Sequence, residues 1–197
     1  MMKAILFDVD NVIITPPGYG ANFTLESEGL SNIDVSEFFH GVFLECQKGE
    51  KDLKEELKPF LDKWGYKKTA DEFLKNWFDY ENCINEKMVK KIQEYRKSGI
   101  ICALATRQEK YRLAYIYDVM KLNGIVDKTY ASCNIGYTKP QREYFEYILN
   151  DLKFEPEKVL FWDNELSNVK GAQELGINAE VYEGFENFEN KMRDFYE

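Results

Sequence analysis

The chain has 197 residues, of which 44% are hydrophobic, 15% aromatic and 31% charged. With only 12 glycines and 5 prolines, this composition excludes a disordered or low-complexity chain and is typical of one folded domain, or of a core with a modest insertion. The 26 basic and 35 acidic residues give a formal net charge of −9, which repels nucleic acids and anionic membranes at long range. Neither is therefore an expected partner.

Membrane insertion and secretion are not indicated either. No apolar run approaches the roughly 18 residues that a membrane-spanning helix requires, and segment 1–8 becomes charged too early for a signal peptide. We therefore expect a cytoplasmic protein that is a monomer or a homodimer. Because the chain has no C-x-x-C pair, its scattered cysteines are interpreted as reduced structural thiols; they are Cys46, Cys83, Cys102 and Cys133.

The first predicted element is a short buried strand. Residues Lys3 to Phe7 form an apolar, β-prone run that ends at Asp8-Val9-Asp10. Segment 15–29 then contains two prolines and three glycines. We expect an irregular, flexible connection there, because these residues cannot continue the strand.

Apolar residues then follow a helical spacing as far as residue 80. The first two stripes consist of Val35, Phe38, Phe39, Val42 and Phe43, and of Leu53, Leu57, Phe60 and Leu61. The pair Thr69 and Glu72 forms a capping-box pattern, which predicts the start of a third helix. Because this stretch contains no convincing strand, we expect a helical subdomain at residues 16–82, inserted into a core formed by residues 1–15 and 83–197.

Strands and helices alternate after this insertion. Helices are predicted at 85–98, 108–122, 140–152 and 166–175, and strands at 100–105, 129–133, 158–162 and 179–182. This alternation is typical of parallel strands joined by right-handed crossovers. The sequence therefore predicts an α/β fold, a Rossmann-like doubly wound parallel sheet with an inserted helical cap subdomain.

Polar side chains follow four of the predicted strands, in the order Asp8 and Asp10, Thr106, Lys139, and Asp163 with Asn164. Each of these residues alone has an ordinary explanation, such as a helix cap or a solvated side chain. In an open parallel sheet, however, ligands bind beyond the carboxyl ends of the strands. The whole set is therefore expected to meet at one site.

The chemistry of this set favours phosphoryl transfer. Clustered carboxylates repel one another unless a cation lies among them, and an oxygen-rich site suits Mg²⁺. A lysine and a hydroxyl can hold a phosphoryl group whose charge spreads over its oxygens. One carboxylate can attack phosphorus and form an aspartyl-phosphate, while a second carboxylate two residues further on moves a proton.

These segments resemble the four ordered motifs of the haloacid dehalogenase (HAD) superfamily. The resemblance rests on residues 5–12, the strand that ends at Thr106, residues 138–140 and residues 159–164, and it extends to residues 168–172. The insertion between the first and second motifs resembles that of members with a small helical cap. The resemblance implies a Mg²⁺-dependent phosphatase that hydrolyses a small phosphorylated metabolite.

The resemblance also implies a role for each motif residue. Asp8 would be the nucleophile and Asp10 the general acid and base, and both would hold Mg²⁺, Asp10 through its backbone carbonyl. Thr106 would hydrogen-bond the phosphoryl oxygens, and Lys139 would neutralise charge on the nucleophile and the phosphate. The last motif would complete the metal site, and the cap would exclude water and contact the substrate.

Three positions depart from the family pattern. Asn11 stands where glycine is usual, and asparagine tolerates unusual backbone angles better than most residues. Arg107 follows Thr106 where asparagine is common, and it could bind a substrate anion or only begin a helix. The pair Asp163-Asn164 replaces two acidic residues, the second of which often ligates the metal. We expect weaker Mg²⁺ binding through the Asn164 amide, or a shift of the ligand to Asp163.

Other functions stay open on the sequence alone. A phosphomutase would use the same core on a sugar phosphate, and Asn11 and Asn164 leave room for a catalytically weakened HAD-fold binding protein. A true dehalogenase needs no metal, and Asp10 counts against it. The one histidine, His40, lies on an apolar stripe and is interpreted as a packed or partly exposed residue.

Overall fold

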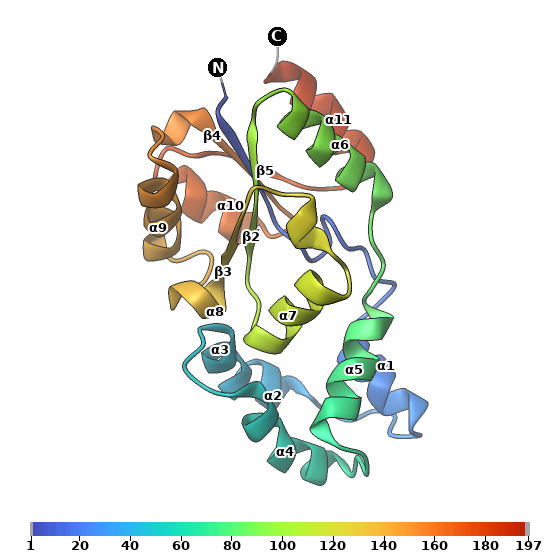
Figure 1. The fold of residues 1–197 in the computed structure, drawn as a ribbon. Coiled ribbons are helices and arrows are strands. Elements are labelled where there is room, and N and C mark those ends of the chain that lie inside the picture. The colour runs from blue at the N-terminus through green and yellow to red at the C-terminus, as the bar shows by residue number, and fades with distance from the viewer. Residues whose placement is uncertain (1, 196–197) are drawn as a thin grey trace.

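A parallel sheet forms the centre of the computed structural model, which describes residues 2–195 (Figure 1). Its strands are β1 (Ala4–Phe7), β2 (Ile101–Thr106), β3 (Lys128–Ala131), β4 (Val159–Asp163) and β5 (Asn178–Val181). They pair in the order β3-β2-β1-β4-β5, and all of these pairings are parallel. The chain thus builds the sheet outward from β1, first to one side and then to the other. The strand order reverses at β1, and ligands bind at such a switch point in open α/β sheets.

Strand β1 forms because all of its side chains can be buried. Ala4, Ile5, Leu6 and Phe7 are each 0% exposed. Ile5 and Phe7 join the core on one face of the sheet, and Ala4 and Leu6 join the core on the other, since successive side chains of a strand alternate. A continuous apolar run is what a strand with helices on both faces requires.

Helices cover both faces of the sheet (Figure 1). One face carries α6 (Glu86–Lys97), α7 (Lys110–Asp118) and α11 (Phe185–Asp194), and the other carries α9 (Arg142–Leu152) and α10 (Leu166–Gln173). Met88 and Phe188 pack from the first group, and Tyr144 and Val169 from the second. The connections contain the short helices α8 (Ser132–Ile135), η1 (Leu122–Gly124) and η2 (Pro156–Lys158). The predicted α/β, doubly wound parallel sheet is confirmed.

Between β1 and α6 the chain forms α1 (Gly20–Ser27), α2 (Ser36–Phe39), α3 (Val42–Gln47), α4 (Leu53–Trp64) and α5 (Ala70–Tyr80). Figure 1 shows these helices beyond the carboxyl ends of the strands. They enclose a hydrophobic cluster of their own. At its centre Phe38 is 0% exposed, and its ring centroid lies 5.1 Å from those of Phe39 and Phe60. Helices α1–α5 therefore have a core that is separate from the two cores of the sheet.

The predicted capping box opens α5 as expected. The backbone N–H of Glu72 donates to Thr69 Oγ1 at 3.2 Å, and the backbone N–H of Thr69 donates to Glu72 Oε2 at 2.9 Å. These two bonds satisfy donors that a helix N-terminus otherwise leaves without partners. Asn85 likewise caps α6 through Met88 N, at 3.3 Å.

The prediction of an irregular connection at 15–29 is wrong for Gly20–Ser27, which forms α1. Gly20 resembles a helix breaker in the sequence, but it is needed where α1 approaches α5. A Cβ at Gly20 would lie 2.4 Å from Trp77 Cδ1, which is closer than these atoms can pack. Only contact with a distant helix reveals this use of glycine.

Three other local predictions need correction. The first apolar stripe does not form one helix, because the chain breaks at Gly41 between α2 and α3. Cys133 lies in α8 and not in the preceding strand. Pro140 does not sit in the first turn of α9 but in a turn before it, after a cis peptide bond to Lys139.

In the part of the chain that the structure describes, no helix is both long and apolar enough to span a membrane. The four cysteines are free thiols, as predicted, and they are Cys46, Cys83, Cys102 and Cys133.

Gly171 on α10 packs directly against the loop that precedes α9. A Cβ at Gly171 would lie 2.5 Å from the carbonyl oxygen of Pro140. Gly171→Ala is therefore expected to lower the free energy of unfolding by about 1–3 kcal/mol, measured by urea denaturation. Gly124→Ala is the matched control, because no described atom lies within 4 Å of a Cβ there. Equal stability of the two variants would contradict this packing.

Candidate active site

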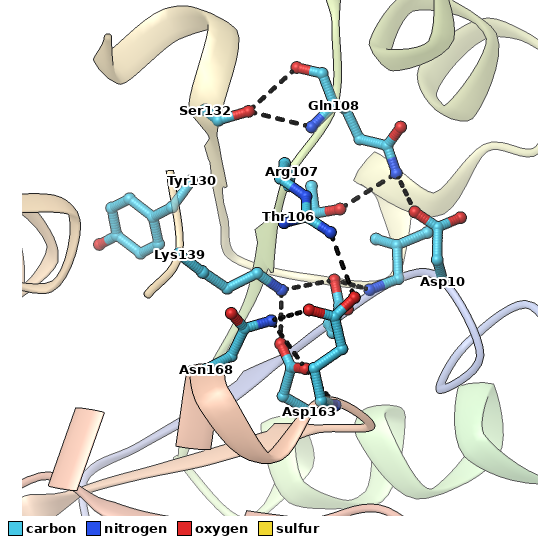
Figure 2. A network of polar contacts seen from close by, with 12 residues as sticks. Asp10, Thr106, Arg107, Gln108, Tyr130, Ser132, Lys139, Asp163 and Asn168 are labelled. Carbon is cyan, nitrogen blue, oxygen red and sulfur yellow. Dashed lines mark hydrogen bonds and ion pairs between the residues drawn. The ribbon is translucent and has the colours of Figure 1, made fainter. Parts of the chain in front are cut away.

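The carboxyl edge of the sheet brings together four of the predicted site residues, and Figure 2 labels Thr106, Lys139 and Asp163 among them. Asp8 follows β1, Thr106 ends β2 and Asp163 ends β4, and these three strands are neighbours. Lys139 reaches them from the loop before α9. The four residues are 7%, 0%, 0% and 2% exposed, respectively. The site is therefore a buried polar cluster within an apolar sheet.

Lys139 is an ammonium group held between two carboxylates. Its Nζ lies 2.8 Å from Asp8 Oδ1 and 2.6 Å from Asp163 Oδ2. Burial alone would lower the pKa of Lys139, but the charges of Asp8 and Asp163 outweigh burial and raise that pKa. Lys139 is therefore charged, and it links the ends of β1 and β4.

Asp8 is held on one side only. Its Oδ1 accepts hydrogen bonds from Val9 N at 2.7 Å and from Lys139 Nζ. Burial raises the pKa of Asp8 from 3.8 to about 7; Lys139 opposes this shift, and the charges of Asp163 and Asp10 add to it. Among the described residues Oδ2 has no hydrogen-bond donor, and Asp8 lines a cavity of about 90 Å³. One oxygen of this carboxylate is thus available to a ligand.

Asp163 is occupied on both sides. Besides the bond from Lys139, its Oδ1 accepts from Glu165 N at 2.7 Å and from Asn168 Nδ2 at 3.0 Å. Asp163 does not line the cavity next to Asp8, whereas Asn164 does. In this motif, Asn164 is therefore accessible to a ligand, whereas Asp163 orients Lys139.

The side chains around the small cavity offer mainly oxygen atoms as potential metal ligands, but few of them are acidic groups placed close together. Asp8, Asp10 and Asn164 line it together. Over the described residues, no group of three or more His, Cys, Asp or Glu side chains is arranged to hold a metal ion. Such a site fits a hard cation that accepts amide, carbonyl and water oxygens alongside one or two carboxylates, as Mg²⁺ does. It does not fit a closed zinc site.

Gln108 is a site residue that the sequence reasoning missed. Its Nε2 donates to Asp10 Oδ2 at 2.5 Å and to Thr106 Oγ1 at 3.2 Å (Figure 2). The helix predicted from residue 108 starts later, at Lys110. Gln108 therefore belongs to the loop at the end of β2 and joins Asp10 to Thr106. A polar residue two places after a strand end was the available signal.

Arg107 and Asn11 show how two of the unusual positions are used. Arg107 lies in the loop before α7, and its Nη2 contacts Glu165 Oε1 at 3.1 Å. It lines both the small cavity and a larger one. Asn11 adopts a φ of 59°, the left-handed conformation that glycine and asparagine tolerate best. His40 is exposed at the end of α2, outside the buried cluster.

A larger cavity of about 370 Å³ adjoins the small one. Both are lined by Asp10, Asn11, Gln47, Arg107, Asn164 and Glu165. The larger cavity, unlike the small one, is also lined by Trp77 and Phe78 of α5 and by Glu81, the residue after α5. This cavity thus lies between the sheet edge and helices α1–α5.

The chain is similar to known proteins over most of its length. A family model described as haloacid dehalogenase-like hydrolase matches residues 2–176. A D-ribitol-5-phosphate phosphatase from Bacteroides thetaiotaomicron is 28% identical over 187 residues, which cover 91% of each chain. The family model covers strands β1 to β4 and helices α1 to α5, which lie between β1 and α6.

Solved structures share the fold. A predicted HAD-like family hydrolase from Porphyromonas gingivalis aligns with a TM-score of 0.83 at 22% identity, covering 100% of this chain and 98% of the other. A HAD family enzyme from Bacteroides thetaiotaomicron, in complex with magnesium and inorganic phosphate, aligns with a TM-score of 0.79 at 22% identity, covering 92% and 94%.

Glu109 is a buried carboxylate in the wall of the larger cavity. It caps α7 by accepting hydrogen bonds from Tyr111 N at 2.7 Å and Arg112 N at 2.5 Å. Burial raises the pKa of Glu109 from 4.5 to about 7, although these two hydrogen bonds and the charge of Arg112 oppose the shift. Between these two pH values, the folded protein holds a proton that the unfolded chain releases. The contribution of Glu109 to stability therefore falls as pH rises through this window.

Glu109→Gln keeps a capping oxygen but cannot ionise. Its free energy of unfolding, relative to that of the unaltered protein, is expected to rise from about pH 4.5 to about pH 7 and then to level off. Urea denaturation across this range measures the difference. Glu143→Gln, at an exposed position in the first turn of α9, is the control. A constant difference for Glu109→Gln at all pH values would refute the raised pKa.

Proposed function

Since this chain belongs to the haloacid dehalogenase-like hydrolase family, we propose that its site hydrolyses a small phosphate monoester through an aspartyl-phosphate intermediate, with Mg²⁺ as cofactor. The observation that carries this proposal is the state of Asp8. One oxygen of its carboxylate is fixed by Val9 N and Lys139, and the other is left for a ligand in the adjoining cavity. This is the arrangement that a carboxylate nucleophile requires.

In the first proposed step, Asp8 Oδ2 attacks phosphorus, and the bond between phosphorus and the ester oxygen breaks. Asp10 gives a proton to the departing alkoxide, so that a neutral alcohol leaves. In the second step, Asp10 takes a proton from a water molecule that attacks the phosphoryl group. The bond between phosphorus and Asp8 then breaks, which releases inorganic phosphate and restores the Asp8 carboxylate and the protonated Asp10 with which the first step began.

The neighbouring side chains would support these steps. Lys139 would neutralise charge on Asp8 and on the phosphoryl oxygens, and Thr106 Oγ1 would hydrogen-bond one of those oxygens. Gln108 would orient Asp10, because its amide already donates to Asp10 Oδ2. Arg107, fixed by Glu165 at the wall of both cavities, would attract the anionic substrate.

Asp8, the backbone carbonyl of Asp10 and Asn164 would hold the metal. When bound, Mg²⁺ would screen the negative charge that gathers between the nucleophile and the phosphoryl oxygens. We propose Asn164 rather than Asp163 as the ligand, because Asn164 lines the cavity and both oxygens of Asp163 are engaged elsewhere. The structural neighbour from Bacteroides thetaiotaomicron was solved with magnesium and inorganic phosphate, which supports this choice of cofactor.

Residues 16–82 would act as a cap over a core formed by residues 1–15 and 83–197. The separate hydrophobic cluster of α1–α5 supports this division. The contact between the two parts is specific, since Ser132 Oγ of α8 donates to the backbone oxygen of Gln47 at 2.6 Å. A cap in this position would keep water away from the phosphoryl site. The named activity of the Bacteroides relative supports a small phosphorylated metabolite as the substrate.

Replacement of the nucleophile tests the mechanism directly. Asp8→Asn is expected to lower turnover of an aryl phosphate in the presence of Mg²⁺ by more than about a thousandfold, because an amide cannot form the acyl phosphate. Phosphate release is the measurement, with D-ribitol 5-phosphate included in the substrate panel. Thermal denaturation serves as the control for folding. An Asp8→Asn variant that retains activity would refute the mechanism.

The metal assignment predicts the effect of restoring a carboxylate. Asn164→Asp adds a negative charge beside the cation, so the Mg²⁺ concentration for half-maximal activity should fall by about threefold or more. A titration of phosphate release with Mg²⁺ measures this shift. Asn134→Asp makes the same change at an exposed position outside the cavities beside Asp8 and should leave the titration unaltered. Identical titrations for both variants would exclude Asn164 as a ligand.

A further inference from the structure

A second buried ion pair lies where the helical insertion meets the sheet. Glu81, one residue after α5, places its Oε2 at 3.2 Å from Arg112 Nη2 on α7, and the two side chains are 14% and 4% exposed. Glu81 Oε1 accepts hydrogen bonds from Gly20 N at 2.9 Å and from Trp77 Nε1 at 2.7 Å. Groups from α1, α5 and α7 therefore fix this carboxylate in place.

Arg112 is held as firmly. Its Nη1 donates to the backbone oxygen of Phe78 at 3.2 Å. The guanidinium carbon lies 5.1 Å from the ring centre of Phe78 and 5.6 Å from that of Tyr115. These contacts leave little freedom to the side chain, and buried charges of this kind are costly unless each is paired.

Both side chains keep unused hydrogen-bonding capacity. A carboxylate offers about four acceptor positions, and the contacts of Glu81 with the described residues use three of them at most. Arg112 Nη2 is buried, and within the described chain it has no hydrogen-bond acceptor in good geometry. Glu81 and Arg112 both line the cavity of about 370 Å³ that also contains Asp10. The free acceptor position on Glu81, beside the guanidinium group that holds this carboxylate, matches a hydroxyl group, which can donate to it.

The charges of this cavity limit what else it can hold. Both guanidinium groups in its wall are already paired, Arg107 with Glu165 and Arg112 with Glu81. A second negative charge on the alcohol part of a substrate would therefore find no unpaired guanidinium among the described lining residues, and it would be repelled by Glu81. A neutral group with hydroxyls would not.

We propose that Glu81 and Arg112 form the subsite for the alcohol part of the substrate and select phosphate esters of neutral polyols over phosphate esters of sugar acids. This inference rests on the proposed function, because the ester oxygen must lie near Asp10 and the rest of the alcohol must extend into the larger cavity. Glu81 binds a substrate hydroxyl, Arg112 holds Glu81 in place, and neither side chain takes part in phosphoryl transfer. They are residues of specificity.

The test compares substrates that differ in one group. Sorbitol phosphate and phosphogluconate differ in a terminal hydroxymethyl or carboxylate, glycerol phosphate and phosphoglycerate form a shorter pair, and para-nitrophenyl phosphate has no further hydroxyl. The unaltered protein should show kcat/KM at least about tenfold higher for the polyol ester than for the acid ester of a pair. Phosphate release with Mg²⁺ is measured throughout.

Glu81→Gln should change this selectivity. The Gln amide oxygen can stay on Gly20 N and Trp77 Nε1, which places NH₂ where Oε2 accepted the hydroxyl. The ratio of kcat/KM for the polyol ester to that for the aryl ester should therefore fall by about tenfold or more, mainly through KM. The preference for the polyol over the acid ester should also weaken, because one negative charge is lost.

Asp79→Asn is the matched control. It makes the same chemical change, from a carboxylate to an amide, on α5. Asp79 also contacts α7, because it accepts a hydrogen bond from Tyr115 Oη at 2.6 Å, but it does not line the cavity. Its substrate ratios should equal those of the unaltered protein. Should Glu81→Gln fail to fold, Glu81→Gln with Arg112→Met removes both charges together and should give the same loss of selectivity.

The outcomes separate this inference from the proposed function. Equal ratios for Glu81→Gln and Asp79→Asn would leave Glu81 with only a structural role and overturn the inference. Hydrolysis of the aryl ester without a preference for polyol esters over acid esters would also overturn it, while the proposed function would stand. An unaltered protein that hydrolyses none of these esters would overturn the proposed function and, with it, this inference.

Discussion

The ammonium group of Lys139, buried between Asp8 and Asp163, sets the constraint to which the rest of the sheet edge conforms. Removing three charges from water is costly, and their mutual attraction offsets this cost only at short distances and in good geometry. The two contacts of 2.8 and 2.6 Å provide that geometry. Removal of Lys139 would leave two buried carboxylates without compensation, so Asp8 and Asp163 both depend on this ammonium group.

Strand register makes this unit possible. Phe7 pairs with Trp162 across β1 and β4, so Asp8 and Asp163 leave the sheet side by side. The loop of Lys139 is fixed in turn by the close approach of Gly171 to Pro140. Both carboxylate oxygens of Asp163 accept hydrogen bonds, one from Lys139 and the other from residues at the start of α10. The neighbouring Asn164 lines the cavity instead. The position where this chain has asparagine and the family usually has an acidic residue is therefore the one that a ligand can reach.

The helical insertion extends the same site with a second paired charge. Glu81 and Arg112 join α5 to α7 at one wall of the larger cavity, while Asp8 and Lys139 line the smaller one. Arg107, held by Glu165, lines the wall that the two cavities share. The two cavities thus differ in their cations, since Lys139 lines only the smaller of them and Arg112 only the larger.

The sequence by itself determined the strands, the order of their polar ends and the α5 capping box, because these features depend on residues close together along the chain. The apolar run before Asp8 and the pattern at Thr69 and Glu72 are such local signals. Only the tertiary structure decided that Gly20 belongs to a helix, that Gln108 holds Asp10, and that Glu81 faces Arg112. The partners in these contacts come from distant segments, 61 residues apart for Gly20 and Glu81 and 98 for Gln108 and Asp10. Periodicity carries no information about which distant side chains packing brings together. The fold could therefore be predicted from the sequence, whereas the side-chain contacts within the site could not.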